Sequence, residues 1–414
     1  MGGRAAAVVV VAGVLLAGCT GAPSPVPTAV PTGAQGSSSA SPTATPAVGA
    51  TTRAPGPTTA GLGVPATGTV RDVPTVHVAS ASDVAANLPV PWGIDFLPGG
   101  QAVVTLRDEA RLILVGPDGT VTDVVGQGAD EIHATTKPAG EGGLLGVSVL
   151  PGATAVSADL AIYQTTADDN RIVRATLSGS TLGPTRPILT GIPKGNIHNG
   201  GRLAVGPDGM LYVGTGEAGD RRLAQDPISL GGKVLRITPD GAPAPGNPDP
   251  SSPIWDTGHR NVEGIGFAPD GRVFASEFGQ DTWDELNVLV PGGNYGWPAV
   301  EGMGGTSQGF IDPVAVWRTD EASPSGIAVT ADAVYMAALR GERLWRIPLH
   351  PLAAGAAPTD PAGIGTPQVV LDGYGRMRAV VVAPDGSLWV LTNNTDGRGT
   401  PRAGDDRILR VVLG

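Results

Sequence analysis

The stretch RLAVGPDGMLYVGT, residues 202–215, consists of an apolar run, a Pro-Asp-Gly turn and a second apolar run. Proline at the second turn position and glycine at the fourth are typical of a type I turn with a bulge, so the stretch predicts a β-hairpin. Successive copies begin 53, 56, 62, 62 and 53 residues apart, which gives six copies of one unit. The copies begin at Gly93, Gly146, Arg202, Gly264, Gly326 and Ala379.

A third apolar strand follows most copies, for example KVLRITP from Lys233 and RILRVVL from Arg407. Six sheets of about four strands, at a period near 50 residues, predict an all-β fold: a six-bladed β-propeller. A further apolar run at residues 73–78 precedes the first copy, and we expect it to complete the last blade beside residues 407–413. A two-sheet sandwich is the alternative, but it would not need six equivalent hairpins.

The composition excludes several classes of protein. The chain has 414 residues, 27 basic and 38 acidic, and a formal net charge of −11. A nucleic-acid binder needs a basic face to displace counterions from phosphates, so this balance argues against one. The 63 glycines and 39 prolines argue against a helical bundle, because both residues break helices. The single cysteine, Cys19, excludes an intrachain disulfide and a cysteine-based zinc site.

The first nineteen residues are typical of an export signal, in which Arg4 precedes an apolar run at residues 5–16 that is too short to span a bilayer comfortably. The run ends in Leu-Ala-Gly-Cys, which resembles a bacterial lipobox and implies cleavage before Cys19 and lipidation of its thiol. A plain secretory signal is the alternative. Residues 20–69 are rich in Pro, Thr, Ser, Ala and Gly, so we expect a disordered tether there and the folded domain at residues 70–414.

Three polar clusters lie beside predicted inner strands, where the loops of a propeller converge on its channel. Residues 195–202 carry His198, a candidate general base, and residues 258–261 carry Arg260, which could stabilise a developing oxyanion. Residues 276–285 carry four carboxylates, a hard oxygen set that suits calcium. Each cluster also has a purely structural interpretation: a loop histidine, an ion-paired arginine and a solvated acidic loop.

Together the clusters resemble the glucose/sorbosone dehydrogenase family, whose soluble members use pyrroloquinoline quinone (PQQ). The similarity runs through most of the chain after residue 85, and its specificity lies in the order and spacing of the motifs. The family fold is a six-bladed propeller, in agreement with the repeat count. The motifs are EGGLLG at 141–146, the His198 cluster, GKVLRI at 232–237, GHRN at 258–261, residues 276–285 and GNYGWP at 293–298.

The resemblance implies catalytic roles for three residues. His198 matches the histidine that takes the hydroxyl proton of the substrate as hydride passes to the quinone. Glu217 falls where the family usually carries an aspartate that could orient this histidine. Arg260 matches the arginine beside the quinone oxygen, where negative charge builds up during hydride transfer.

The resemblance also implies a cofactor and metal set. Asn261 matches a cofactor contact, and Arg376 and Arg378 match the pair that grips the cofactor carboxylates. Because they occupy alternate strand positions, these two arginines face the same way. The backbone carbonyls of Gly279 and Gln280 match those that hold the calcium of the cofactor. The segment that holds a second, structural calcium in relatives corresponds here to Glu277, Asp284, Glu285 and Tyr295.

Three positions depart from the pattern of the glucose-oxidising members. Arg340 replaces a lysine of the cofactor site and keeps its charge but not its shape. Glu141 replaces a glutamine near the substrate, where its charge could repel or redirect a ligand; we include both residues in the predicted cofactor site. Gln280 replaces a proline, which is harmless if only its carbonyl is used.

The leading hypothesis is PQQ- and calcium-dependent oxidation of an aldose or related sugar alcohol at the outer face of the cytoplasmic membrane. The lipid anchor at Cys19 would hold the enzyme in the cell envelope, where an unidentified envelope acceptor would take the electrons. A non-catalytic propeller lipoprotein that binds a glycan or an envelope protein is one alternative, supported by Arg340 and Glu141. A calcium-dependent lactonase-like hydrolase is another, but the carboxylates cluster on one loop instead of converging from several blades.

Overall fold

A computed structural model of the chain describes residues 76–414. The predicted export signal with Cys19 and the predicted tether at residues 20–69 lie outside the described residues, so these expectations stay predictions. In the part of the chain that is described, no helix is long and apolar enough to cross a membrane.

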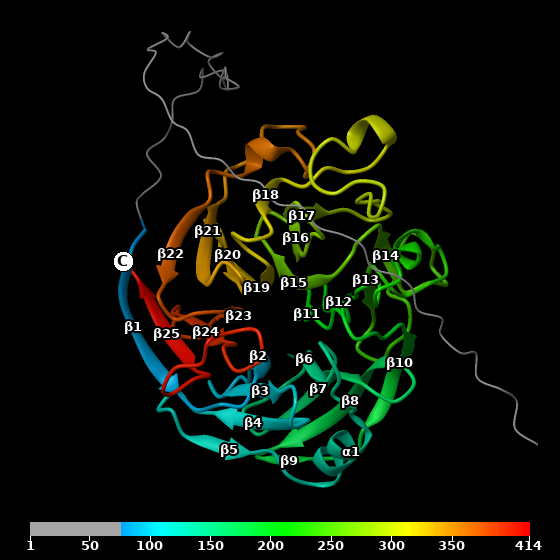
Figure 1. The fold of residues 1–414 in the computed structure, drawn as a ribbon. Coiled ribbons are helices and arrows are strands. Elements are labelled where there is room, and N and C mark those ends of the chain that lie inside the picture. The colour runs from blue at the N-terminus through cyan, green and yellow to red at the C-terminus, as the bar shows by residue number, and fades with distance from the viewer. Residues whose placement is uncertain (1–75) are drawn as a thin grey trace, which may run out of the picture. The chain divides into compact units, whose positions relative to one another are not determined.

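Six sheets stand in a ring, each built from antiparallel strands (Figure 1). The first strands of neighbouring blades contact one another, so they form the innermost layer around the channel. The prediction of an all-β, six-bladed propeller is confirmed. Within residues 76–414 the helices are α1 (Gln127–Thr135) and three single 3-10 turns, η1 (Arg221–Gln225), η2 (Thr306–Gln308) and η3 (Pro361–Gly363).

From inner to outer strand, blade 1 comprises β2 (Pro91–Phe96), β3 (Ala102–Leu106), β4 (Arg111–Val115) and β5 (Val121–Asp123), and blade 2 comprises β6 (Leu144–Val149), β7 (Ser157–Thr165), β8 (Asn170–Ser178) and β10 (Arg186–Ile192), with β9 (Thr181–Leu182) paired to β8. Blade 3 comprises β11 (Leu203–Val205), β12 (Leu211–Gly214), β13 (Lys233–Ile237) and β14 (Ile254–Thr257), and blade 4 comprises β15 (Val262–Phe267), β16 (Val273–Glu277), β17 (Trp283–Leu289) and β18 (Ala315–Arg318). Blade 5 comprises β19 (Pro324–Val329), β20 (Ala333–Ala338), β21 (Arg343–Pro348) and β22 (Gln368–Asp372), and blade 6 comprises β23 (Met377–Val382), β24 (Leu388–Thr392), β25 (Ile408–Leu413) and β1 (Val78–Ala85).

The repeated turn has the predicted geometry, as the hairpin between β11 and β12 illustrates. The N–H of Gly206 donates to the carbonyl of Met210 at 2.8 Å, and the N–H of Gly209 donates to the carbonyl of Gly206 at 2.9 Å. Gly209 has a φ of 74°, a left-handed conformation that glycine adopts without a steric penalty. Asp208 accepts the N–H of Met210 through Oδ1 at 3.0 Å, which closes the turn.

The ring is closed by strands from the two ends of the described domain. β1 pairs antiparallel with β25, with Ala81 opposite Val411, and backbone hydrogen bonds between His77 and Gly414 extend the ladder. The expected closure of the last blade is confirmed, but the described strand runs from Val78 to Ala85, so it shares only Val78 with the described part of the predicted run; residues 73–75 lie outside the described residues. An outermost strand packs on one side only and needs few apolar residues, so the apolar run was a poor guide to its position.

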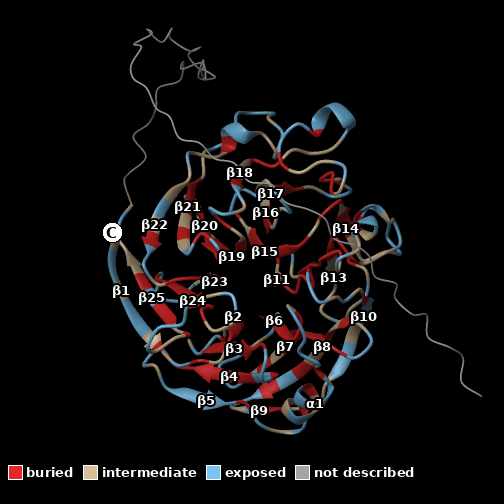
Figure 2. Cartoon of the chain, in the orientation of Figure 1, coloured by how far each residue is buried: buried red, intermediate tan, exposed pale blue. Residues whose placement is uncertain are grey.

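The core lies between neighbouring blades, where the apolar faces of adjacent sheets meet (Figure 2). Val103 and Leu114 of blade 1, for example, pack in one cluster with Ile162 of blade 2. Blade 6 meets blade 1 through an edge-to-face contact between Trp389 and Phe96, whose ring centres are 5.0 Å apart. Because the blades are wedged against one another, loops at one end of the channel are held on a rigid support.

Candidate active site

A cavity of about 400 Å³ opens where loops of all six blades meet. Its walls come from the segments that precede the inner strands and from the loops that follow the second strands. The lining residues are Trp92, Arg107, Glu141, His198, Arg260, Asn261, Glu263, Phe278, Gly279, Gln280, Asp284, Thr319, Ser323, Leu339, Arg340, Arg376, Arg378 and Arg398. A second cavity of about 600 Å³ is bordered mainly by apolar residues of the inner strands.

His198 and Glu217 form a buried pair at the edge of the first cavity. Nδ1 of His198 hydrogen-bonds to Oε1 of Glu217, a carboxylate that is only 2% exposed. A carboxylate in its ionised form can only accept, so this contact favours the tautomer with the hydrogen on Nδ1, in which a neutral imidazole has its lone pair on Nε2. His198 also has a φ of 55°, a left-handed conformation that is costly for a non-glycine residue and is held here by the surrounding loop.

Backbone hydrogen bonds join the loops that carry the three predicted catalytic residues. The N–H of Glu217 donates to the carbonyl of Arg260 at 2.9 Å, and the N–H of Ala218 donates to the carbonyl of His198 at 3.0 Å. Asn261 accepts the N–H of Gly200 through Oδ1 at 2.9 Å. His198, Glu217 and the Arg260–Asn261 pair are therefore brought together, as predicted, although they come from separate loops.

The carboxylate of Glu141 is shared between the histidine loop and the opposite rim of the cavity. Oε2 accepts the backbone N–H of His198 at 2.7 Å, and Oε1 forms an ion pair with Arg398 at 2.7 Å. Burial opposes ionisation of Glu141, but these contacts outweigh it and hold its pKa below the usual value. Arg398 thus compensates the charge of Glu141, and the expectation that this carboxylate could repel or redirect a ligand stays a prediction.

Arg260 reaches into the cavity with few protein partners. Its Nη1 donates to the carbonyl of Phe278 at 3.2 Å, its guanidinium lies 5.7 Å from the ring centre of Trp297, and its Nε is buried without a hydrogen-bond partner in the described residues. Burial lowers the pKa of Arg260. Its backbone N–H donates to Glu277, which fixes the loop behind it.

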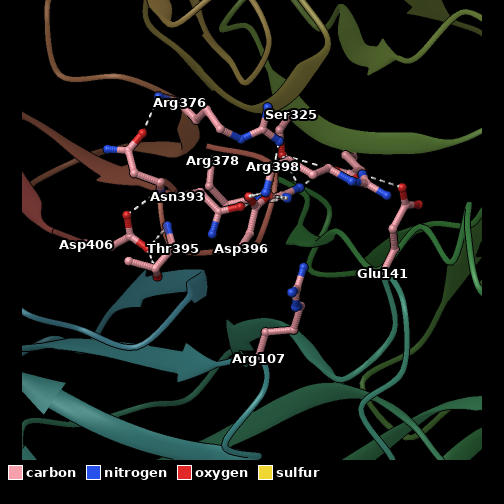
Figure 3. A network of polar contacts seen from close by, with 12 residues as sticks. Arg107, Glu141, Ser325, Arg376, Arg378, Asn393, Thr395, Asp396, Arg398 and Asp406 are labelled. Atoms are coloured by element: carbon pink, nitrogen blue, oxygen red, sulfur yellow. Dashed lines mark hydrogen bonds and ion pairs between the residues drawn. The ribbon is translucent and has the colours of Figure 1, made fainter. Parts of the chain in front are cut away.

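Arg376 and Arg378 flank the start of β23 (Figure 3). Arg376 pairs with Asp396 at 3.1 Å, and Arg378 pairs with Glu263 at 2.5 Å. Both arginines are buried and both line the cavity, as the predicted clamp requires. Arg340 also lines the cavity but is exposed, and it makes no side-chain hydrogen bond or ion pair within residues 76–414.

The predicted metal residues separate into two groups. Gly279 and Gln280 line the cavity, and no described residue donates a hydrogen bond to either carbonyl oxygen. Their N–H groups are bound to Asp284 at 2.9 Å and to Glu301 at 2.8 Å. Glu301 accepts further N–H bonds from residues 281–283, so one carboxylate shapes this loop from behind.

The other four residues are not gathered as a metal site, and in the described residues no three His, Cys, Asp or Glu side chains form a candidate set. Glu277 instead binds Nδ1 of His259 at 2.6 Å, and Nε2 of His259 lies 3.1 Å from Asp256. The ring of Tyr295 stacks on His259 with 4.6 Å between centres. The sequence shows how many carboxylates this segment contains, but it does not show that the buried His259 is the partner of Glu277.

Burial dominates the protonation of the remaining two carboxylates. It raises the pKa of Asp284 to about 7, against hydrogen bonds from the N–H groups of Ser323 and Gly279. Burial and the neighbouring charge of Glu277 raise the pKa of Glu285 to about 8. Both groups therefore sit in an interior that disfavours charge, in contrast to the solvated acidic loop considered from composition.

The model of the glucose/sorbosone dehydrogenase family matches residues 88–409. The chain belongs to this family. Its fold and the motifs that suggested the resemblance are thereby confirmed, and the prediction of an oxidoreductase is confirmed at the level of the family.

Relatives of known name agree. The PQQ-bound aldose sugar dehydrogenase of Streptomyces coelicolor is 53% identical, with a TM-score of 0.74 over 82% of this chain and 98% of that chain. Quinoprotein glucose dehydrogenase B of Acinetobacter calcoaceticus is 30% identical over 53% of this chain, and the match spans about half, 52%, of that relative. The aldose sugar dehydrogenase of Escherichia coli is 28% identical over 78% of this chain and 91% of that relative.

Sequence reasoning missed several residues of this family member's cavity. Glu263 follows the GHRN motif by two positions, and side-chain alternation along a strand would have placed it beside Asn261. Arg398 and Asp396 lie in the loop between β24 and β25, where no motif marks them. The contact between Arg398 and Glu141 spans 257 residues of sequence, so no local pattern could have indicated it.

Proposed function

We propose that the chain oxidises an aldose or related sugar alcohol with PQQ as its cofactor. The observation that carries the proposal is the convergence of the His198–Glu217 pair and Arg260 on one cavity with an arginine-rich wall. Relatives named as quinoprotein glucose dehydrogenase and aldose sugar dehydrogenase support this substrate class.

The cavity fits a planar tricarboxylate such as PQQ. Its volume of about 400 Å³ lies in the range of small-molecule sites. The buried Nε atoms of Arg260 and Arg376 have no hydrogen-bond partner in the described residues and are available to oxygen acceptors of a ligand. Six arginines line the cavity: Arg107, Arg260, Arg340, Arg376, Arg378 and Arg398.

When bound, PQQ would supply the two-electron acceptor for the hydride of the substrate. His198 would accept the hydroxyl proton at Nε2, the ring nitrogen left free by its bond to Glu217. Glu217 would stabilise the resulting imidazolium without moving, because its loop is tied to that of Arg260. Arg260 would face the negative charge that develops in the cavity.

We further propose that the carbonyl oxygens of Gly279 and Gln280 hold a calcium ion next to the cofactor. Both residues border the cavity, and calcium prefers such hard oxygen ligands. The buried Glu277 and Glu285 are left out of this proposed site, because their oxygens already accept hydrogen bonds from the protein.

The sequence supports a location at the outer face of the cytoplasmic membrane, with a lipid on Cys19 and an envelope protein or small molecule as electron acceptor. Replacing Cys19 by Ser should release the protein from the membrane fraction. If the Cys19→Ser chain stays in that fraction at wild-type levels, the proposed anchor is wrong.

The proposal is tested by calorimetric titration of PQQ into the purified chain, with calcium and with a chelator. Tight binding that depends on calcium, followed by sugar-dependent reduction of an artificial electron acceptor, is the expected result. His198→Ala should abolish turnover and leave PQQ binding nearly intact, since the imidazole acts on the substrate. Absence of binding at tens of micromolar would overturn the proposal and leave a propeller that binds some other ligand.

A further inference from the structure

A buried carboxylate sits among the arginines of the cavity. Glu263 belongs to β15 and is 6% exposed, yet it lines the same space as Arg260, Arg376 and Arg378. A buried charge is costly unless it is paired and hydrogen-bonded, so its contacts define what it does.

Glu263 is bound on every side. Its Oε2 accepts Nη1 of Arg378 at 2.5 Å and Oγ of Ser325 at 2.8 Å. Its Oε1 accepts Nδ2 of Asn261 at 3.2 Å, and its backbone carbonyl accepts Nε of Arg202 at 2.6 Å. One side chain thus links the residue next to Arg260 with one half of the arginine clamp.

These contacts require an acceptor at both side-chain oxygens. Asn261 cannot turn its amide round, because its Oδ1 already accepts the N–H of Gly200. Its Nδ2 must therefore donate towards Glu263. A glutamine could serve Arg378 and Ser325 with its single oxygen, but its NH2 group would then face the NH2 group of Asn261. The position is built for an ionised carboxylate.

The other cavity carboxylates are committed elsewhere. Glu141 pairs with the exposed Arg398 at the rim, and Asp284 accepts backbone N–H bonds from Gly279 and Ser323. Asp396 pairs with Arg376 at 3.1 Å and more distantly with Arg378 at 4.0 Å, but it does not line the cavity and does not contact Asn261. Glu263 is therefore the negative charge that directly contacts both the clamp and the Arg260 loop.

We propose that Glu263 is a positioning residue and a fixed counter-charge, which holds Arg378 and Asn261 in place and lowers the reduction potential of the redox cofactor bound beside them. Electron density added next to a fixed negative charge in a low-dielectric cavity is disfavoured, whereas the six arginines favour it. Glu263 offsets part of that pull and so favours return of electrons to the acceptor. This inference rests on the proposed function, because it needs a quinone in the cavity.

The test is a spectroelectrochemical titration of the PQQ-loaded chain, which reads the potential of the cofactor without turnover. Glu263→Gln should raise the midpoint potential, and a tenfold shift in the ratio of oxidised to reduced cofactor corresponds to about 30 mV for two electrons. Glu263→Asp keeps the charge and disturbs the packing, so it should stay near the wild-type potential. Ser325→Ala removes one hydrogen bond to the same oxygen without changing charge and should do likewise.

The outcomes separate the two proposals. If Glu263→Gln binds PQQ with the wild-type potential, the counter-charge role is wrong while the proposed function stands. If Glu263→Asp shifts the potential as far as Glu263→Gln, packing and not charge is responsible, and the inference also fails. If the wild-type chain binds no PQQ, the proposed function fails first and takes this inference with it.

Discussion

Replacing His259 by glutamine should destabilise the domain more than most single substitutions. His259 is fully buried between Asp256 and Glu277, and Tyr295 stacks on its ring. Burial alone would lower the pKa of His259, but the two carboxylates outweigh it and raise the pKa to about 10. At neutral pH the side chain is therefore an imidazolium that compensates two buried acids. Glutamine keeps a donor but removes the charge.

The expected loss follows from leaving buried charges without their partner. Removing one member of a buried ion pair costs about 3–5 kcal/mol. Unfolding entropy is about 2.1 cal/mol/K per residue, so for a domain of about 340 residues this loss lowers the melting temperature by about 4–7 °C. Thermal unfolding of the full chain followed by circular dichroism measures it. His133→Gln is the matched control, because that histidine is exposed on α1 and should leave the melting temperature unchanged.

The pH dependence gives a second, independent check. The folded pKa of His259, about 10, exceeds its ordinary value of 6.5, so the folded state holds an extra proton between these limits. The resulting stability is complete below about pH 6.5 and is lost as the pH rises towards 10. The deficit of the His259→Gln chain should therefore shrink over this window. A melting temperature within 1 °C of wild type, or a deficit that stays constant from pH 6.5 to 10, would refute the reasoning.

Three further outcomes are expected. Glu217→Gln should lower kcat by about 10²–10⁴-fold with little change in PQQ affinity, because the amide can donate to Nδ1 of His198 and reverse the tautomer of the ring. An unchanged kcat would show that the carboxylate does not orient the base. Arg398→Ala should change the free energy of unfolding by less than about 1 kcal/mol in chemical denaturation, because the arginine side chain of the Arg398–Glu141 pair is 55% exposed. KM for the sugar should rise, because the charge of Glu141 is then no longer compensated. A larger loss of stability would contradict this view of the pair. Arg376→Lys should weaken PQQ binding at least tenfold by calorimetry, because lysine lacks the planar fork of donors, and equal affinity would argue against the clamp.

The repeat in the sequence was enough to predict the propeller, because each hairpin carries its own turn signal and apolar alternation. The position of β1 was not predictable in the same way. Half of its residues, VASASDVA, are exposed and one is buried, so its side chains give a weak signal, and its position depends on pairing with the backbone of β25. Its partner lies at the other end of the chain, beyond the reach of any local pattern.

The same distinction, between local sequence signals and contacts with distant residues, applies to the residues of the site. Residues inside a motif, such as His198 and Arg260, were found because the motif marks them. Glu263 and Arg398 were missed, because what makes them important is a contact with a distant residue. The contacts of the carboxylates between Glu277 and Glu285 were not predicted for a related reason: composition shows the carboxylates, but only the fold shows that adjacent strands place Glu277 opposite Glu285 and beside His259.

The closure of blade 6 also sets an order in which the protein can fold during its synthesis. β1 is made before any other strand of the described domain, while its partner β25 is made last, some 330 residues later. During translation β1 remains without its partner strand, and blade 6 cannot be completed until the ribosome has synthesised β25. Five blades can pair within themselves as they emerge, so the pairing of β1 with β25 is the last to form. A chain that stops before β25 would leave unpaired the edges of β1 and β24 that pair with β25, and these edges would be exposed to quality-control factors.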